Sequence, residues 1–196
     1  MTEEFISVQD RILTSSIDII SDSGLGALNT KNIARYTGVD EAMLYKYYSN
    51  VDEVLVDVVE YYFRFDKGIF STLASKDISN LEKVRRYLES YASYYSNYIA
   101  LSSIMLQNEE LLHNPATRDA VLEGVNYRNA NIQAFFQGAI DDHEIRDDLS
   151  AETLTNLVHG FLASLIFNRR VRNHKRDIKF ELLDCYDKTM SFIKAD

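Results

Sequence analysis

The segment Leu44–Tyr48 reads Leu-Tyr-Lys-Tyr-Tyr and places aromatic rings, hydroxyl groups and one amine on a single short helix. Hydroxyls and amines donate hydrogen bonds, so this short helix carries several donors beside its aromatic rings. The apolar residues Ile33 and Ala34 precede Gly38, which suits a turn that needs a positive φ. This spacing is typical of two short helices that close as a helix-turn-helix.

The stretch from Gly24 through Leu55 resembles the DNA-binding domain of the TetR/AcrR family of bacterial transcriptional regulators. Gly24 and Gly26 close a first helix, and the later matches are Thr30-x-x-Ile-Ala-x-x-x-Gly-Val39 and Leu44-Tyr-x-Tyr-Tyr48. Further on, Gly138–Ile140 and Glu144–Leu149 resemble the turn before the family's last two helices. The resemblance therefore spans nearly the whole chain.

The resemblance implies that the helix from Asp40 to Tyr48 enters the major groove of one half-site. It assigns base contacts to Glu41, Ala42, Met43 and Lys46, and backbone contacts to Thr30, Lys31, Tyr45 and Tyr47. Glu41 fits two roles, since an acidic first turn complements the helix dipole and a carboxylate can also accept from cytosine N4. Val51 occupies a position where the family usually has a phosphate-binding lysine, so one expected backbone contact is missing.

Tyrosines recur at three- and four-residue spacing along the expected fifth helix. Together with apolar residues from neighbouring helices they are candidates to line an effector pocket that is apolar with scattered hydroxyls. The alternative is an ordinary aromatic core. The candidate ligand-binding residues are Tyr91, Tyr94, Tyr95, Tyr98, Met105, Phe135 and Phe136.

The last two expected helices carry apolar residues on more than one face, which is more than one subunit can cover. A four-helix contact between two copies would bury the surplus, and Gly160 and Ala163 would let the helices approach closely. The candidate dimerisation residues are Leu154, Val158, Phe161, Leu165, Leu183, Tyr186 and Met190.

Other chemistry has little support in the sequence. No nucleophile elbow, phosphate loop or dinucleotide fingerprint is present, and no histidine pair has the spacing of a helical metal site. The sequence predicts no enzyme, no cofactor and no metal. The basic cluster between Arg169 and Arg176 fits a solvated helix end or an anion contact, and we expect the acidic loop from Asp141 to Leu149 to be solvated.

Composition agrees with a cytoplasmic helical protein. The chain has 196 residues, one proline, a single cysteine at position 185, and no apolar run long enough to cross a membrane. Its formal charge of −9 is unusual for a nucleic-acid binder. Residues 1–60 hold only four basic residues against eleven acidic ones.

We therefore predict an all-α fold of about nine helices, with a DNA-binding domain over residues 1–50 and a ligand-binding and dimerisation domain over residues 51–196. Helix starts are expected at Asn29, Asp40, Asn50, Ser79, Asn114 and Ser150, and a first helix over residues 3–22.

The resemblance implies a homodimeric repressor that binds a near-palindromic operator in double-stranded DNA and responds to an apolar or aromatic small molecule. The alternative is a protein-interaction co-regulator on the same fold that has lost operator binding. Val51, Glu41 and the few cations motivate that alternative.

Overall fold

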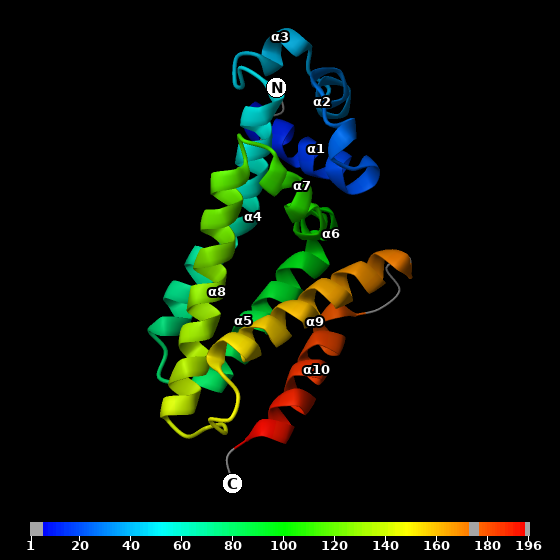
Figure 1. Cartoon of the computed structure of the whole chain (residues 1–196). Coiled ribbons are helices and arrows are strands. Elements are labelled where there is room, and N and C mark those ends of the chain that lie inside the picture. The colour runs from blue at the N-terminus through cyan, green and yellow to red at the C-terminus, as the bar shows by residue number, and fades with distance from the viewer. Residues whose placement is uncertain (1–5, 173–176, 195–196) are drawn as a thin grey trace. The chain divides into compact units, whose positions relative to one another are not determined.

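The computed structural model describes residues 6–172 and 177–194, and these residues are all-α apart from one isolated bridge between Ile145 and Lys194. The all-α prediction is confirmed. Lys175, Arg176 and the predicted start of the first helix at residue 3 lie outside the described residues. The elements are α1 (Val8–Ser23), η1 (Leu25–Ala27), α2 (Thr30–Thr37), α3 (Glu41–Leu44), α4 (Val51–Ala74), α5 (Asn80–Asn97), α6 (Ile99–Ser102), η2 (Ser103–Gln107), α7 (Asn108–His113), α8 (Arg118–Asp141), α9 (Ala151–Val171) and α10 (Ile178–Ile193) (Figure 1).

The chain divides into two compact units, and α4 and α8 each contribute to both. The first unit comprises Met1–Phe63 with Ile99–Gly124, and the second comprises Arg64–Tyr98 with Val125–Asp196. The functional boundary after residue 50 remains a prediction about which residues bind DNA.

The first unit is built around the α1–α2–α3 cluster, whose apolar sides meet. Ile12, Ile17 and Ile33 are fully buried, and Leu44 closes the core from α3. In the second unit α10 packs against α5 and α9, and its core is aromatic, with Tyr87, Tyr91, Tyr95, Phe70 and Phe136 all fully buried.

Helix starts follow the local sequence closely. The side chains of Asn29, Asp40 and Ser150 each accept from a backbone N–H three residues later, as predicted. Gly38 adopts the left-handed conformation (φ 75°, ψ 24°) and its N–H donates to Ala34 O at 2.9 Å.

Several predicted boundaries were wrong. Ile6 and Ser7 were expected inside the first helix but precede it, since Ser7 caps the helix that begins at Val8. The continuous α-helix of α3 ends at Leu44, and Tyr45–Tyr47 form a turn instead of extending the helix to Tyr48. The helix expected after Asn114 begins at Arg118, and residues 115–117 form a turn. Asn114 does cap this turn, since its side chain accepts from Ala116 N at 2.8 Å and its carbonyl accepts from Arg118 N at 3.0 Å.

The prediction of a solvated loop between Asp141 and Leu149 was also wrong in part. Ile145 is only 2% exposed, and the bridge joins it to Lys194. Glu144 accepts from the backbone N–H groups of Asn80 and Leu81 at 2.7 and 3.1 Å, so its carboxylate caps α5. Ser79, the predicted start of this helix, also caps it, because its hydroxyl accepts from Glu82 N at 3.2 Å.

Candidate functional site

The turn between α2 and α3 is held from both of its ends. The Asp40 carboxylate accepts from Met43 N at 2.6 Å, and the Arg11 guanidinium donates to Thr37 O at 2.7 Å at the end of α2. Arg11 therefore neutralises the negative end of a helix dipole, and three of the four basic residues in the first 60 are left to contact phosphate.

The predicted DNA-contact residues lie on the outside of this unit. Tyr45 and Tyr47 are 54% and 43% exposed, although large aromatic side chains are usually more buried than this. Tyr36, at 45% exposure, has the Arg35 guanidinium 5.5 Å from its ring centroid, and adds an aromatic side chain that the sequence pattern did not indicate. The other predicted contacts are exposed (Lys31, Glu41, Ala42, Lys46) or half-buried (Thr30, Met43).

Tyr48 turns inward, unlike its two neighbours in the motif. It is 4% exposed, and its hydroxyl donates to Asp57 on α4 at 2.7 Å. Burial raises the pKa of Tyr48, and the hydrogen bond to Asp57 raises it further. This contact ties the end of the α3 segment, defined as α3 and the following turn over residues 41–48, to the first half of α4. Spacing alone did not show that Tyr48 is buried while Tyr45 and Tyr47 are exposed.

The predicted ligand-binding tyrosines form a contiguous aromatic core in the second unit. Tyr91 and Tyr95 have ring centroids 4.2 Å apart, and Phe65 stacks on Tyr94 at 4.1 Å. Tyr91, Tyr95 and Phe136 are fully buried, Phe135 is 8% exposed, and Tyr94, Tyr98 and Met105 are half-buried. This packing fits the core interpretation for the buried rings and leaves the pocket a proposal.

A buried polar cluster lies inside that aromatic core and was not predicted from the sequence. Asp66 on α4, 1% exposed, accepts from Arg128 Nε at 2.8 Å and from the Tyr87 hydroxyl at 3.2 Å. The signal was present, since Asp66 lies one helical turn from the apolar residues Tyr62 and Phe70 on the buried stripe of α4.

His159 on α9 borders the cluster. Burial lowers its pKa to about 4, and the positive charge of Arg128 adds to the shift, so the imidazole is neutral at pH 7. Its Nε2 atom is shielded from solvent without a hydrogen-bond partner among the described residues. A neutral ring with one available nitrogen can donate to or accept from a bound polar group.

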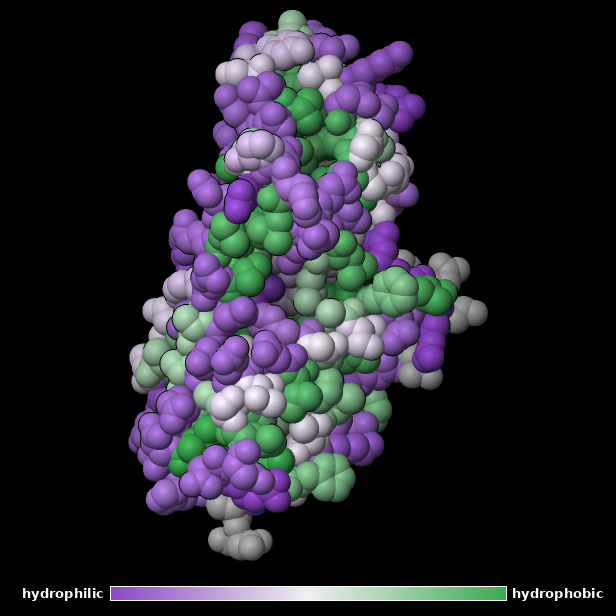
Figure 2. All heavy atoms as spheres, in the orientation of Figure 1, coloured by the Kyte–Doolittle hydropathy of each residue, from purple (hydrophilic) through white to green (hydrophobic). Residues whose placement is uncertain are grey.

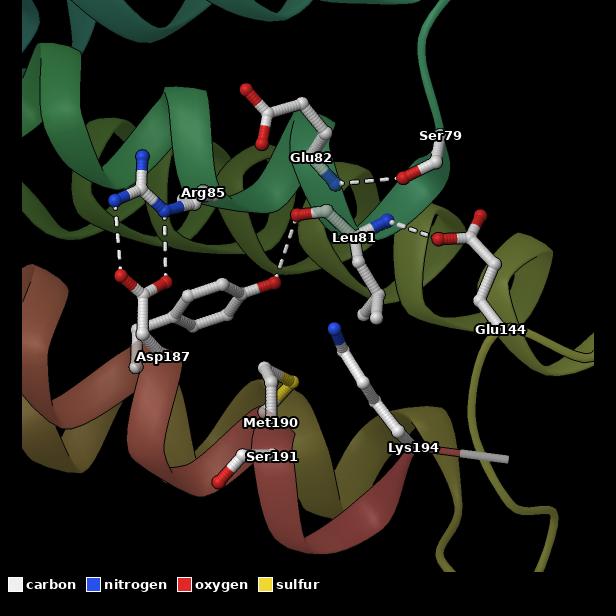
Figure 3. Close-up of a pocket in the computed structure, with 10 residues that line it drawn as sticks. Ser79, Leu81, Glu82, Arg85, Glu144, Asp187, Met190, Ser191 and Lys194 are labelled. Carbon is white, nitrogen blue, oxygen red and sulfur yellow. Dashed lines mark hydrogen bonds and ion pairs between the residues drawn. The ribbon is translucent and has the colours of Figure 1, made fainter. Parts of the chain in front are cut away.

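A cavity of about 530 Å³ opens between the start of α5 and the end of α10, within the second unit (Figure 3). Leu81 on α5 and Met190 on α10 line it from opposite sides, and Lys194 lines it at the end of α10. Most of its polar groups already have partners. Arg85 forms a bidentate pair with Asp187 at 2.8 and 3.0 Å, and Tyr186 donates to Leu81 O at 2.8 Å.

None of the predicted ligand-binding residues lines this cavity. The charged pair at its edge holds α10 against α5, so the polar residues of this cavity are explained by helix packing and need no ligand.

Four of the predicted dimerisation residues lie inside the single chain, which corrects the interface expected from the sequence. Leu154 and Val158 on α9 are fully buried, and Tyr186 and Met190 are 2% and 4% exposed on α10, which packs against α5 and α9. Phe161, Leu165 and Leu183 are half-buried.

The apolar surface of α9 and α10 is formed by other residues. Figure 2 shows hydrophobic side chains reaching the surface at the C-terminal end of α9 and along α10. The large apolar side chains that are exposed there are Leu157, Phe167, Val171, Phe180 and Phe192.

The described residues contain no group of three His, Cys, Asp or Glu side chains placed to hold a metal ion. In the same part of the chain, no helix has both the length and the hydropathy to cross a bilayer.

Comparison with known proteins identifies the fold. No protein-family model matches the sequence, and a search of curated proteins finds no match. Solved structures match over nearly the full length: the MbdR regulator from Azoarcus sp. CIB at TM-score 0.83 and 12% identity, covering 94% of this chain and 97% of that one. The TetR family regulator PfmR from Thermus thermophilus matches at 0.81 and 18%, covering 93% and 98%.

A third match is FadR from Bacillus subtilis in complex with stearoyl-CoA, at TM-score 0.73 and 17% identity, covering 93% of this chain and 95% of that one. The chain therefore has the fold of the TetR-family transcriptional regulators, as the resemblance implied.

Proposed function

We propose that this protein is a homodimeric, DNA-binding transcriptional repressor whose operator affinity changes when a small molecule binds the helical bundle. The observation that carries the proposal is the exposed surface of α3 and the following turn, where two tyrosines and a lysine face solvent on the fold of known regulators. Solvent-exposed aromatic residues next to a cation suit contact with a duplex better than they suit a monomer's free surface.

In this proposal each side chain has a distinct task. Lys46 and the residues Glu41, Ala42 and Met43 at the start of α3 contact base edges, since the first turns of a recognition helix enter the groove. Thr30, Lys31, Tyr45 and Tyr47 contact the phosphate backbone and fix the protein's position on the duplex.

The effector in this proposal is apolar, with few polar atoms. The aromatic core of α4, α5 and α8 offers rings and a few hydroxyls, which suits a ligand of that type. The Bacillus subtilis FadR structure, which has the same fold, contains stearoyl-CoA, whose acyl chain is apolar. This likeness supports a lipid-like or aromatic effector class.

A second copy of the chain would cover the exposed apolar residues of α9 and α10. Leu157, Phe167 and Val171 lie on the outer side of α9, and Gly160 on the same side has no atom near its missing Cβ. Small residues of this kind permit close approach of two helices. This surface replaces the buried residues first expected at the interface.

The test is selection of duplexes from a random-sequence library by the purified protein, followed by gel-shift titration of the selected duplex. We expect a near-palindromic consensus, and at least a tenfold loss of affinity for Tyr45→Ala/Lys46→Ala with the dimer intact by sedimentation. Leu122→Ala is the matched control for loss of an exposed apolar side chain, because Leu122 on α8 is 40% exposed and has no part in the proposed contact. Failure of the wild-type dimer to enrich any sequence at low salt would contradict the proposal and favour a protein-interaction role.

A further inference from the structure

Asp66 on α4 and Arg128 on α8 form a buried ion pair, and burying two charges costs free energy of desolvation that calls for an explanation. Asp66 is 1% exposed and Arg128 is 3% exposed. The carboxylate accepts from Arg128 Nε at 2.8 Å and from the Tyr87 hydroxyl at 3.2 Å, while the guanidinium carbon lies 5.5 Å from the Tyr91 ring centroid. Three helices therefore meet at one carboxylate.

Stability alone does not explain such a pair. Removing two charges from water costs several kcal/mol each by general estimates, and well-packed apolar replacements of buried ion pairs are often as stable or more stable. Directional hydrogen bonds do provide something that apolar packing does not. Because only one offset between α4 and α8 brings Nε to Oδ2, the pair selects a single helix register.

The position of α4 matters to the α3 segment. Asp57, nine residues before Asp66 on the same helix, accepts the Tyr48 hydroxyl at 2.7 Å and so holds the end of the turn that carries Tyr45 and Tyr47. One helix thus has two carboxylates, one bonded to the α3 segment and one bonded to α8 and α5.

Phe63, on the preceding turn of α4, lies against the backbone of α8 at Gly124. A Cβ at position 124 would overlap the Phe63 ring, so the two helices are in close contact there. Aromatic packing against a glycine sets how near the helices come, and the ion pair one turn further on sets their offset along the axis.

We propose that Asp66 and Arg128 are positioning residues that hold α4 in the single register at which the α3 segment binds DNA. This inference rests on the proposed DNA-binding function. It assigns the pair a role in DNA binding that is separate from its contribution to stability. Tyr87 belongs to the same positioning group, because its hydroxyl donates to Asp66.

The test is a comparison of variants that separate charge, stability and register. Asp66→Asn and Arg128→Met each leave one partner buried without the other, and we expect a lower Tm for both. Asp66→Leu/Arg128→Met removes both charges and should recover most of the Tm. We nevertheless expect this double variant to bind the selected duplex at least tenfold more weakly than wild type at a temperature where both are folded.

Leu88→Ala is the matched control, because Leu88 is fully buried on α5 and takes no part in the pair. It should lower the Tm and leave the affinity within twofold of wild type. A double variant that binds the duplex as tightly as wild type would overturn the proposal, since the pair would then be replaceable by any packed core.

Two further measurements keep the proposal testable if the double variant does not fold or if no duplex is selected. Tyr87→Phe removes only the hydroxyl and should fold. In this variant we expect backbone amides around Asp66 and Arg128 to exchange hydrogen at least threefold faster relative to the other core amides of the second unit, a local change that Leu88→Ala should not produce. Unchanged exchange would refute the positioning role, whereas a failed duplex selection would refute the DNA-binding proposal alone.

Discussion

His159 lies on α9 with its imidazole largely shielded from solvent, and this burial, assisted by the charge of Arg128, lowers its pKa to about 4. A histidine whose pKa falls on folding binds fewer protons in the native state than in the unfolded state. Its contribution to stability is therefore complete above the unfolded pKa of about 6.5 and is lost as the pH falls toward 4. We expect His159→Phe to remove roughly 2 kcal/mol of this acid sensitivity, after allowing for partial solvent access.

Chemical denaturation at several pH values between about 7 and 4.5 gives the free energy of unfolding at each pH. The effect is the difference between wild type and variant in the slope of that free energy against pH. The matched control is His113→Gln, because the His113 side chain is 76% exposed and should leave the slope unchanged. Parallel curves for wild type and His159→Phe would show that the imidazole titrates normally.

Tyr47 and Tyr48 are adjacent in sequence and differ in environment, and this gives a second prediction. Tyr48 is buried and donates to the Asp57 carboxylate, so Tyr48→Phe should lower the free energy of unfolding by about 1 to 2 kcal/mol. Tyr47 is 43% exposed, so Tyr47→Phe should leave stability within about 0.5 kcal/mol of wild type and weaken duplex binding. Thermal unfolding and gel-shift titration of both variants separate the two effects, and equal loss of stability in both would contradict the assignment.

The local sequence predicted correctly those residues whose hydrogen-bond partners lie within one helical turn along the chain. Asn29 and Asp40 accept from backbone three residues ahead, and Gly38 meets a local need for positive φ, so short-range patterns were sufficient. Asp66 and Arg128 are 62 residues apart, and no local pattern pairs them. A charge on an apolar stripe indicates that a partner exists without saying which residue it is.

At the scale of the helix, Gly124 and Gly68 have opposite environments and give a third prediction. Gly124 on α8 lies against the Phe63 ring, while Gly68 on α4 has no neighbouring atom within 4 Å of the point that a Cβ would occupy. Gly68→Ala should stabilise the protein by about 0.5 to 1 kcal/mol, since alanine favours a helix interior over glycine. Gly124→Ala should destabilise it by about 1 to 3 kcal/mol, because the added methyl group overpacks the contact.

Urea unfolding of both variants measures these changes, and a second substitution tests the cause. Phe63→Leu should recover part of the loss in Gly124→Ala, giving a coupling energy of at least about 1 kcal/mol between the two positions. Additive effects would mean that the ring and the glycine do not interact.

The positions of the helices were predicted better than the side of each helix that packs inside its own subunit. Apolar spacing identified α9 and α10, but both helices are apolar on more than one side, and periodicity does not say which side faces its own subunit. Leu154 and Tyr186 were assigned to a second copy and are buried within their own chain instead. The N-terminus of α5 shows the same limit, since Ser79 was predicted as its cap and Glu144, 64 residues from Asn80, was not.

At the scale of the whole molecule, a net charge of −9 and few cations near α3 set how DNA binding should depend on salt. Each lysine or arginine that neutralises a phosphate releases counterions and contributes about −0.9 to the slope of log K against log salt concentration. Arg11 is engaged at the end of α2, so Lys31, Arg35 and Lys46 remain, and two copies bring at most six cations to the duplex.

The expected slope for the selected duplex is therefore no steeper than about −5, with neutral hydroxyl donors such as Tyr45 supplying affinity that salt does not screen. Lys31→Ala should make the slope shallower by about 2 for the dimer, because two phosphate contacts are lost. Tyr45→Phe should weaken binding at every salt concentration and leave the slope unchanged, since a hydroxyl releases no counterion. Fluorescence anisotropy titrations between about 50 and 300 mM salt measure all three slopes. A wild-type slope well beyond about −5 would show that cations other than Lys31, Arg35 and Lys46 contact the duplex. An unchanged slope for Lys31→Ala would show that Lys31 does not contact a phosphate.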